Sequence, residues 1–254
     1  MTDPPVFVVG DVHGHRDVLA SLLRDAGLLD ARDRWAGGDS RLWLLGDLVD
    51  RGPDGIGAIE LAMALERDGR AGSLIGNHEV LLLGALLLGS VALGPNRETY
   101  FDVWEYNGGQ LSDLRGLSAE HLEWLMRRPA VAVEGDWALL HADTARYLEL
   151  GASVDAINDK AAEALLAAEP GEFGRLLDCV SDRFGLADER SLERLLEAFG
   201  AKRVIHGHTP IALVLDRSPV GVRKPLVSPD GRVVNVDHCL FGGGPGFVTR
   251  LDEL

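Results

Sequence analysis

Residues 6–14 read Val-Phe-Val-Val-Gly-Asp-Val-His-Gly, and residues 41–52 read Arg-Leu-Trp-Leu-Leu-Gly-Asp-Leu-Val-Asp-Arg-Gly. Each stretch begins with a short apolar run, which predicts a buried strand, and continues into glycine and polar residues, which predict a loop. Glycine permits a tight turn and a close approach of the backbone to a ligand. The two stretches therefore predict an α/β fold whose functional side chains follow the carboxyl ends of its strands.

The rest of the chain continues with segments of helical and strand periodicity. Apolar residues at helical spacing predict helices at 17–26, 56–67, 79–88, 154–168 and 191–199. Short apolar runs predict further strands at 72–76, 130–133, 137–140, 203–206, 232–236 and 246–251. The alternation of strands and helices in the first half favours a mainly parallel sheet with right-handed crossovers. The interval 215–229, which is rich in Pro, Ser and Gly, is expected to be a loop.

Size and charge exclude several classes of protein. The chain has 254 residues, of which 46% are hydrophobic, so it can bury a substantial core. Its formal net charge of −15 argues against non-specific binding to nucleic acid or to an anionic membrane surface. No apolar run reaches the roughly 18 residues that a membrane-spanning helix needs. We therefore expect neither a nucleic-acid partner nor a membrane protein.

Two further features bear on location. The chain begins Met-Thr-Asp-Pro-Pro, without the basic and apolar regions of a signal peptide. Its two cysteines, Cys179 and Cys239, have no spacing typical of a disulfide framework or a metal site. We therefore expect a cytoplasmic location with reduced thiols. The sequence leaves the oligomeric state open.

Five short segments that follow predicted strands carry polar side chains suited to metal binding. They are Gly10-Asp11-Val12-His13-Gly14, Gly46-Asp47-Leu48-Val49-Asp50-Arg51-Gly52, Gly76-Asn77-His78-Glu79, His141-Ala142-Asp143 and Gly207-His208-Thr209. Carboxylates, an amide and imidazoles together suit a borderline divalent ion such as Mn, Fe, Zn or Co. One carboxylate can bridge two ions about 3.5–4 Å apart, and such a pair binds phosphoryl oxygens and lowers the pKa of a trapped water.

The order of these segments resembles the phosphoprotein phosphatase branch of the calcineurin-like metallophosphoesterase superfamily. The tract 35–54, with the sequence GDLVDRGPDG at its end, is most similar to bacterial members and to the Shewanella-like phosphatases. The resemblance implies an α/β four-layer sandwich in which helices flank two mixed β-sheets. It also implies a single domain over residues 1–254, with helical insertions at about 95–128 and 154–199.

Carried over residue by residue, the resemblance implies a site for two divalent metal ions. Six side chains would hold them: Asp11 and His13 on the first ion, Asp47 on both, and Asn77, His141 and His208 on the second. Mn is the expected metal, with Fe, Zn, Co and Ni as alternatives.

The same resemblance implies the catalytic groups. His78 would be the general acid for the leaving alkoxide, and Asp50 would orient it. Arg51 would clamp the phosphate oxygens through its planar guanidinium, and Asn77 would also contact the substrate.

A second phosphate clamp is expected at Arg183. Many protein phosphatases carry Arg immediately before the GNHE motif, where this chain has Ile75. A phosphate dianion generally needs more than one charge-assisted donor besides the metals. Members of the family carry another Arg before the Gly-His segment, at about the sequence separation of Arg183 from His208. The family's Arg adjoins an aromatic residue, as Arg183 adjoins Phe184. The alternatives are a surface position, with an ion pair to Asp182 or Asp188, and a clamp formed by another arginine: Arg175, Arg190 or Arg194.

The function that these residues predict is metal-assisted hydrolysis of a phosphomonoester, by in-line attack of water or hydroxide held by the two ions. The expected substrates are phosphoserine or phosphothreonine in proteins, or small phosphomonoesters. The alternative enzymatic substrates are dinucleoside polyphosphates, such as diadenosine tetraphosphate, or phosphodiesters. An inactive phosphate-binding scaffold is the alternative of another class, although an intact ligand set weighs against it.

Several other polar and aromatic residues have two possible roles. His206 lies on the same side of its strand as His208 and could contact the site. Asp143 could bond to a ligand histidine or cap a turn. Four aromatic residues are expected to form a core stripe rather than a substrate groove: Tyr100, Phe101, Trp104 and Tyr106. Three histidines are expected at the surface or behind the ligands: His15, His121 and His238.

Overall fold

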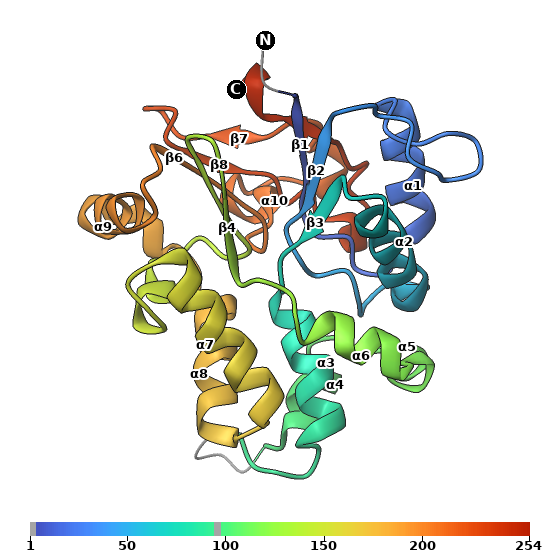
Figure 1. Ribbon diagram of the computed structural model, residues 1–254, viewed down its shortest axis with the longest axis vertical. Coiled ribbons are helices and arrows are strands. Elements are labelled where there is room, and N and C mark those ends of the chain that lie inside the picture. The colour runs from blue at the N-terminus through green and yellow to red at the C-terminus, as the bar shows by residue number, and fades with distance from the viewer. Residues whose placement is uncertain (1–3, 94–97) are drawn as a thin grey trace.

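The computed structural model describes residues 4–93 and 98–254, and Figure 1 shows two β-sheets with helices around them. The first sheet has the strand order β3-β2-β1-β9. Its parallel strands are β1 (Val6–Val9), β2 (Arg41–Leu44) and β3 (Ala71–Ser73), and β9 (Thr249–Arg250) runs antiparallel to β1. The register aligns Val9 with Leu44, so β1 and β2 end at the same edge of the sheet.

The second sheet has the strand order β4-β5-β6-β8-β7. Its central strands are parallel and its edge strands antiparallel to their neighbours: β4 (Val131–Glu134), β5 (Trp137–Leu140), β6 (Arg203–His206), β8 (Val233–Asn235) and β7 (Leu226–Val227). The register aligns Leu140, His206 and Asn235, so three strands also end together here. The predicted α/β fold with two mixed sheets is confirmed.

Alternate residues of the strands enter two separate apolar cores. Val8 of β1 and Ile205 of β6 belong to one cluster, which is built from residues of both sheets and therefore lies between them. Their neighbours Val9 and Val204 belong to a larger cluster, which also contains the apolar faces of the helices. Each buried aliphatic side chain contributes roughly 1.5–3 kcal/mol. The two cores together fix the positions of the strand ends.

Helices lie beside the sheets and also gather at one end of them (Figure 1). α1 (Arg16–Asp25) and α2 (Gly55–Arg67) lie beside the first sheet, and α9 (Glu189–Phe199) lies beside the second. The remaining helices are α3 (Asn77–Leu87), α4 (Tyr100–Tyr106), α5 (Leu111–Gly116), α6 (Ala119–Leu125), α7 (Val154–Ala167), α8 (Pro170–Ser181) and α10 (Ile211–Val214). Within the described residues, no helix combines the length and apolar character that crossing a membrane requires.

Most predicted boundaries agree with the structure, and the exceptions have local causes. The third strand ends at Ser73 rather than at residue 76, because Gly76 caps α3 and donates its N–H to the Glu79 side chain at 2.8 Å. The apolar periodicity did not predict α8 as a separate helix between those at 154–168 and 191–199. It starts at Pro170, a residue suited to the first turn of a helix. The expected loop at 215–229 contains the 3-10 turn η3 (Pro219–Gly221) and the short strand β7.

The two expected helical insertions contain α4 to α6 and α7 to α9. Residues 95–97 of the first insertion lie outside the described part of the chain. The assignment of the whole chain to one domain stays a prediction.

Candidate metal centre

The carboxyl ends of strands from both sheets supply the polar side chains of the site. Asp11 and His13 follow β1, and Asp47 follows β2. His141 follows β5 and His208 follows β6 in the other sheet. Because the register brings the strand ends of each sheet to one edge, residues far apart in sequence meet there.

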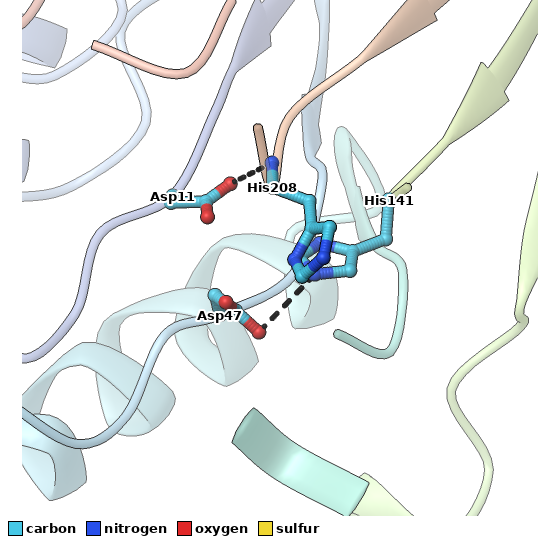
Figure 2. Close-up of side chains that lie close together, drawn as sticks. All are labelled: Asp11, Asp47, His141 and His208. Carbon is cyan, nitrogen blue, oxygen red and sulfur yellow. Dashed lines mark hydrogen bonds and ion pairs between the residues drawn. The ribbon is translucent and has the colours of Figure 1, made fainter. Parts of the chain in front are cut away.

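Two groups of potential ligands share Asp47. In the first, one ligand atom each from Asp11, Asp47, His141 and His208 lie within 4.8 Å of one another, and Figure 2 shows these side chains close together. In the second, atoms of His13, Asp47 and His78 satisfy the same limit. His141 Nε2 lies 3.4 Å from Asp47 Oδ1, whereas His13 Nε2 lies 3.6 Å from Asp47 Oδ2. The two carboxylate oxygens of Asp47 therefore face different imidazoles.

The amide of Asn77 completes the set of six predicted ligands. Asn77 Oδ1 lies 3.0 Å from His141 Nε2. Asp11 is linked to the opposite sheet, because its Oδ1 accepts a hydrogen bond from the backbone N–H of His208 at 2.8 Å (Figure 2). The structure thus brings together all six side chains that the sequence proposed as ligands.

Burial shapes the electrostatics of this cluster. It raises the pKa values of Asp11 and Asp47 well above the usual range, and the neighbouring carboxylates Asp237 and Glu79 add to the effect. It also lowers the pKa values of His13 and His208 well below their usual values, and that of His141 to about 3. Neutral imidazoles are the form of histidine that binds metal ions, and a bound divalent cation would offset the crowding of the carboxylates and favour their ionised form. The donor set therefore fits the metal ions that this type of site implies.

Left-handed backbone conformations occur at several of these positions. His13, Asp47, Asp50, Arg51 and His208 have φ angles between 46° and 64°. For residues other than glycine this region costs of order 1–3 kcal/mol, and it persists only where the surrounding structure enforces it. The strained residues coincide with the loops after β1, β2 and β6, so the strain lies in the site and not in the sheets.

The side chain of Glu79 enforces the loop after β2. Its Oε2 accepts hydrogen bonds from the backbone N–H groups of Asp47 and Gly76, both at 2.8 Å, and its Oε1 accepts one from Leu48 N–H at 2.6 Å. A buried carboxylate with several such donors holds its backbone partners firmly. Sequence reasoning missed this function of Glu79, although the GNHE segment contains the residue.

His78 and Asp50 form a buried pair beside the ligands. His78 Nδ1 lies 2.9 Å from Asp50 Oδ2, and Trp104 Nε1 donates to Asp50 Oδ1, also at 2.9 Å. Burial raises the pKa of Asp50 to about 7, although the bond from Trp104 lowers it. Burial, together with Arg51 and Arg183, lowers the pKa of His78 well below its usual value. Within the described residues, His78 Nε2 has no hydrogen-bond partner.

Arg51 lies against the ligand cluster. Its Nη1 lies 3.0 Å from His13 Nε2, and its Nε donates to the carbonyl oxygen of Asn107 at 3.2 Å. The guanidinium Cζ lies 4.2 Å from the ring centroid of Phe241, whose ring also contacts that of His13. No sequence signal pointed to Phe241, which lies in the 3-10 turn η4 (Leu240–Gly242).

Arg183 lies near the other side of the cluster. Its Nη2 donates to the carbonyl oxygen of His208 at 3.1 Å. It lies beyond the end of α8, and among the described residues it has no ion pair with Asp182 or Asp188. Of the competing arginines, Arg175 pairs with Glu172 at 2.9 Å, and Arg190 and Arg194 lie exposed on α9.

The residues with two possible roles are now placed. Asp143 does neither of the things expected of it, since its carboxylate accepts hydrogen bonds from Phe184 N–H and the Thr209 hydroxyl and so joins two site loops. His206 is buried, and its Nδ1 contacts the carbonyl oxygen of Gly207. Tyr100 and Trp104 belong to the core as expected, whereas Tyr106 is 92% exposed.

Two consecutive residues near the site are fully buried, of which the sequence analysis considered only His238. Asp237, which follows β8, is fully buried, and burial raises its pKa to about 6. Its Oδ1 accepts a hydrogen bond from Cys239 N–H at 2.8 Å. His238, expected at the surface or behind the ligands, is fully buried and packs edge-on against Phe247. The sequence signal that could have identified Asp237 and His238 as buried site residues is their position as a polar pair at the end of a valine-rich strand.

A comparison with protein families decides the membership of the chain. Residues 4–212 match the family described as calcineurin-like phosphoesterase. The chain belongs to this family. The description of this family is that of phosphoesterases, and the family implies divalent metal ions. The two ligand groups of this phosphoesterase lie within the matched residues.

Curated relatives of this phosphoesterase carry two kinds of name. It is 31% identical over 136 residues to a symmetrical bis(5'-nucleosyl)-tetraphosphatase of Dechloromonas aromatica, covering 54% of this chain and 42% of that protein. It is 36% identical over 81 residues to Shewanella-like protein phosphatase 2 of Arabidopsis thaliana, covering 30% of this chain and 21% of that protein. The chain spans about half the length, or less, of these curated relatives.

Solved structures share the fold. A cold-active protein-tyrosine phosphatase of a psychrophilic Shewanella species superposes with a TM-score of 0.72 at 21% identity, covering 99% of this chain and 77% of that one. A putative diadenosine tetraphosphatase superposes with a TM-score of 0.53 at 17% identity, covering 98% of this chain and 94% of that one. At such identities the likeness supports the fold alone.

Proposed function

We propose that this phosphoesterase is a phosphomonoesterase, acting as a serine/threonine protein phosphatase or on small phosphomonoesters, with a dinuclear metal site. The observation that carries the proposal is the position of Asp47, which lies in both groups of potential ligands. His78, the third member of the second group, is assigned to proton transfer and not to metal binding in this proposal. Its two oxygens face His141 and His13, respectively, as a bridging ligand requires. Two divalent ions bound there would polarise the phosphoryl oxygens and provide an activated water as the nucleophile. The mixed oxygen and nitrogen donors favour Mn, with Fe, Zn, Co and Ni as alternatives.

The proton for the leaving alkoxide comes from His78 in this proposal. Nδ1 of His78 is committed to Asp50, which leaves Nε2 for the substrate. The pKa of His78 is low in the free protein because of burial and two nearby arginines. A bound phosphate dianion adds negative charge beside the imidazole and raises that pKa. In this proposal the charged form of His78 is therefore favoured more when substrate is bound than in the free protein.

Two arginines and one amide hold the phosphate in this proposal. Arg51 reaches the cluster from the side of His13, and Arg183 from the side of His208. Guanidinium groups on two sides can each donate two parallel hydrogen bonds to phosphate oxygens. Asn77, which lies beside His141, is both a ligand and a substrate contact.

A second candidate function is hydrolysis of dinucleoside tetraphosphates. It is supported by the names of several curated relatives, including that of Dechloromonas aromatica. It is also supported by Ile75, an apolar residue where many protein phosphatases have a phosphate-side arginine. A non-catalytic scaffold is disfavoured, because the six ligands converge. We propose one domain, and a cytoplasmic location is supported by the two free, buried thiols.

One set of assays tests the function. The protein is treated with EDTA, dialysed and reloaded with single metals, and bound metal is measured by mass spectrometry. Activity is then measured on p-nitrophenyl phosphate, bis-p-nitrophenyl phosphate, a phosphoserine peptide and diadenosine tetraphosphate. We expect up to two ions per chain, best activity with Mn, and hydrolysis of the monoesters. Asp47→Asn should lower both metal content and activity, the latter by roughly three orders of magnitude or more. Full activity of the metal-free protein would sink the proposal.

A further inference from the structure

The chain between His208 and β7 lies at the same edge of the second sheet as the metal ligands. α10 starts directly after Pro210, and Ile211 N–H donates to the carbonyl oxygen of Asp237 at 3.1 Å. β7 re-enters the sheet with Leu226 opposite Asn235, and Asn235 pairs with His206. Residues 210–225, which we call the rim segment, therefore leave and re-enter the sheet beside the site.

The rim segment exposes aliphatic side chains that nothing in the described structure covers. Leu213 is 60% exposed, Val220 58% and Val214 45%. Six consecutive exposed residues, 213–218, follow Ala212, whereas the underside of the segment is held by the buried side chains of Ile211 and Val222. Grouped apolar side chains at a site edge are typical of an interaction surface.

This apolar surface is continuous with the phosphate clamp. The turn η3 packs on the turn η4, since a Cβ atom on Gly242 would lie 3.2 Å from Pro219 Cγ, and one on Gly243 would lie 3.9 Å from Val220 Cγ2. Phe241, between Leu240 and Gly242, is 40% exposed and lies under the guanidinium of Arg51. A substrate held by Arg51 can thus touch Phe241 and the rim segment at once.

The rim segment is also basic, in contrast to the rest of the molecule. It carries three exposed cations, Arg217, Arg223 and Lys224, against one carboxylate, Asp216. Within residues 4–93 and 98–254, none of the three cations forms an ion pair, while most other exposed basic side chains do. The whole chain has a net charge of −15. A basic area beside the site of an acidic protein attracts acidic groups locally.

We propose that the rim segment and Phe241 form a docking surface for the polypeptide on either side of a phosphorylated residue, with a preference for acidic and aliphatic neighbours. This inference rests on the proposed phosphatase function and names its substrate class. Cations interspersed with aliphatic side chains complement an amphiphilic acidic peptide. The bidentate contact by which Asn or Gln reads an adenine edge is absent from residues 210–225, which contain neither residue.

The test compares two triple variants with the same change in charge. The rim variant is Arg217→Ser, Arg223→Ser and Lys224→Ser. The control variant is Arg32→Ser, Arg115→Ser and Arg190→Ser, which removes three exposed arginines that also form no ion pair within the described residues. Both are assayed with Mn on p-nitrophenyl phosphate, on diadenosine tetraphosphate, on a phosphoserine peptide with flanking Glu and Leu, and on the same peptide with flanking Lys and Ser. Melting temperatures show that each variant folds.

We expect the rim variant to lose about tenfold in kcat/KM on the acidic peptide, mainly through KM, because it removes three exposed charges that each contribute modestly to binding. The control variant should keep wild-type values, and p-nitrophenyl phosphate should be unaffected in both. Equal losses of kcat/KM on the acidic peptide in the two variants would attribute the effect to net charge and would contradict the docking proposal. Unchanged peptide kinetics, or a loss confined to diadenosine tetraphosphate, would overturn the docking proposal.

A binding assay separates this inference from the proposed function. A fluorescein-labelled acidic peptide with a non-hydrolysable phosphonate analogue of phosphoserine is titrated with each variant, and its anisotropy is followed. Weaker binding to the rim variant supports docking even if turnover is absent. If wild-type protein hydrolyses no monoester under any metal, the proposed function fails, and this titration alone decides the docking surface. Equal binding to all proteins rejects it.

Discussion

Trp104 donates its indole hydrogen to Asp50 at 2.9 Å, so a helix outside both sheets holds the carboxylate that contacts His78. Trp104 is completely buried in α4, and the other oxygen of Asp50 faces the imidazole. The position of the proposed general acid thus depends on packing of the helical segment as well as on the strand ends.

Trp104→Phe should lower kcat and change its pH dependence. The hydrogen bond from Trp104 favours the ionised carboxylate, so its loss raises the pKa of Asp50 further above about 7. Protonated Asp50 no longer stabilises the charged form of His78. The acidic limb of the pH–activity profile, along which activity falls as the pH decreases, should therefore move to higher pH. We expect about a tenfold loss of kcat at neutral pH. The matched control is Tyr106→Phe, which changes an exposed ring of the same helix. An unshifted acidic limb would contradict this reading of Asp50.

His78→Asn should slow turnover in proportion to how much the leaving group needs a proton. General acid catalysis contributes about 10²–10⁴-fold. The loss should be large on a phosphoserine peptide and small on p-nitrophenyl phosphate, whose leaving group is stable as an anion. Metal content should stay near that of the wild type, which mass spectrometry measures. Equal losses on both substrates would assign the proton to another donor.

Arg183→Ala should weaken binding of phosphate with little effect on stability. One charge-assisted hydrogen bond contributes about 1.5–3 kcal/mol, so the inhibition constant for free phosphate should rise at least about tenfold. Because Arg183 is exposed and bonds only to a carbonyl oxygen of His208, Tm should change little. Arg190→Ala, on the exposed face of α9, serves as the control. Unchanged phosphate inhibition would place the second clamp elsewhere.

Glu79→Gln should destabilise the protein and loosen its metal site. The carboxylate accepts hydrogen bonds from Asp47, Leu48 and Gly76 N–H groups, and an amide would present its own N–H₂ to some of them. Leaving buried donors unpaired costs about 1–3 kcal/mol. Urea unfolding of the metal-free proteins measures this difference, and titration with Mn measures the affinity. The same substitution at exposed Glu105 should do neither. If Glu79→Gln were as stable as the wild type, the loop after β2 would not depend on the Glu79 side chain.

The strand ends could be predicted because their signals are local, and the ligands because the motifs at those strand ends resemble those of a known family. A valine-rich run ending in glycine, such as the one before Asp11, contains a strand and its loop within a few residues. Parallel pairing then brings such loops to one edge whatever their separation in sequence. All six expected ligands, from Asp11 to His208, accordingly lie together.

The supports of the site could not be predicted, because they depend on contacts between distant segments. Trp104 is 54 residues from Asp50, and no periodicity relates an aromatic residue of one helix to a loop of the sheet. His and Asp adopt positive φ angles more often than most residue types, but residue type alone does not show that His13 and Asp47 do so here, because the surrounding structure imposes these angles. Phe241 was missed for the same reason, since only the folded chain places η4 under Arg51.

The bond between Asp11 and His208 joins residues 197 positions apart, and this separation sets the timing of metal capture during synthesis. A ribosome that adds about 5–20 residues per second makes the two ligands roughly 10–40 s apart. Asp11, His13 and Asp47 emerge first, and the group that Asp11 and Asp47 form with His141 and His208 can assemble only after the second sheet has been made. In the proposed dinuclear site, a chain that stops short of His208 would lack one ligand of the second ion.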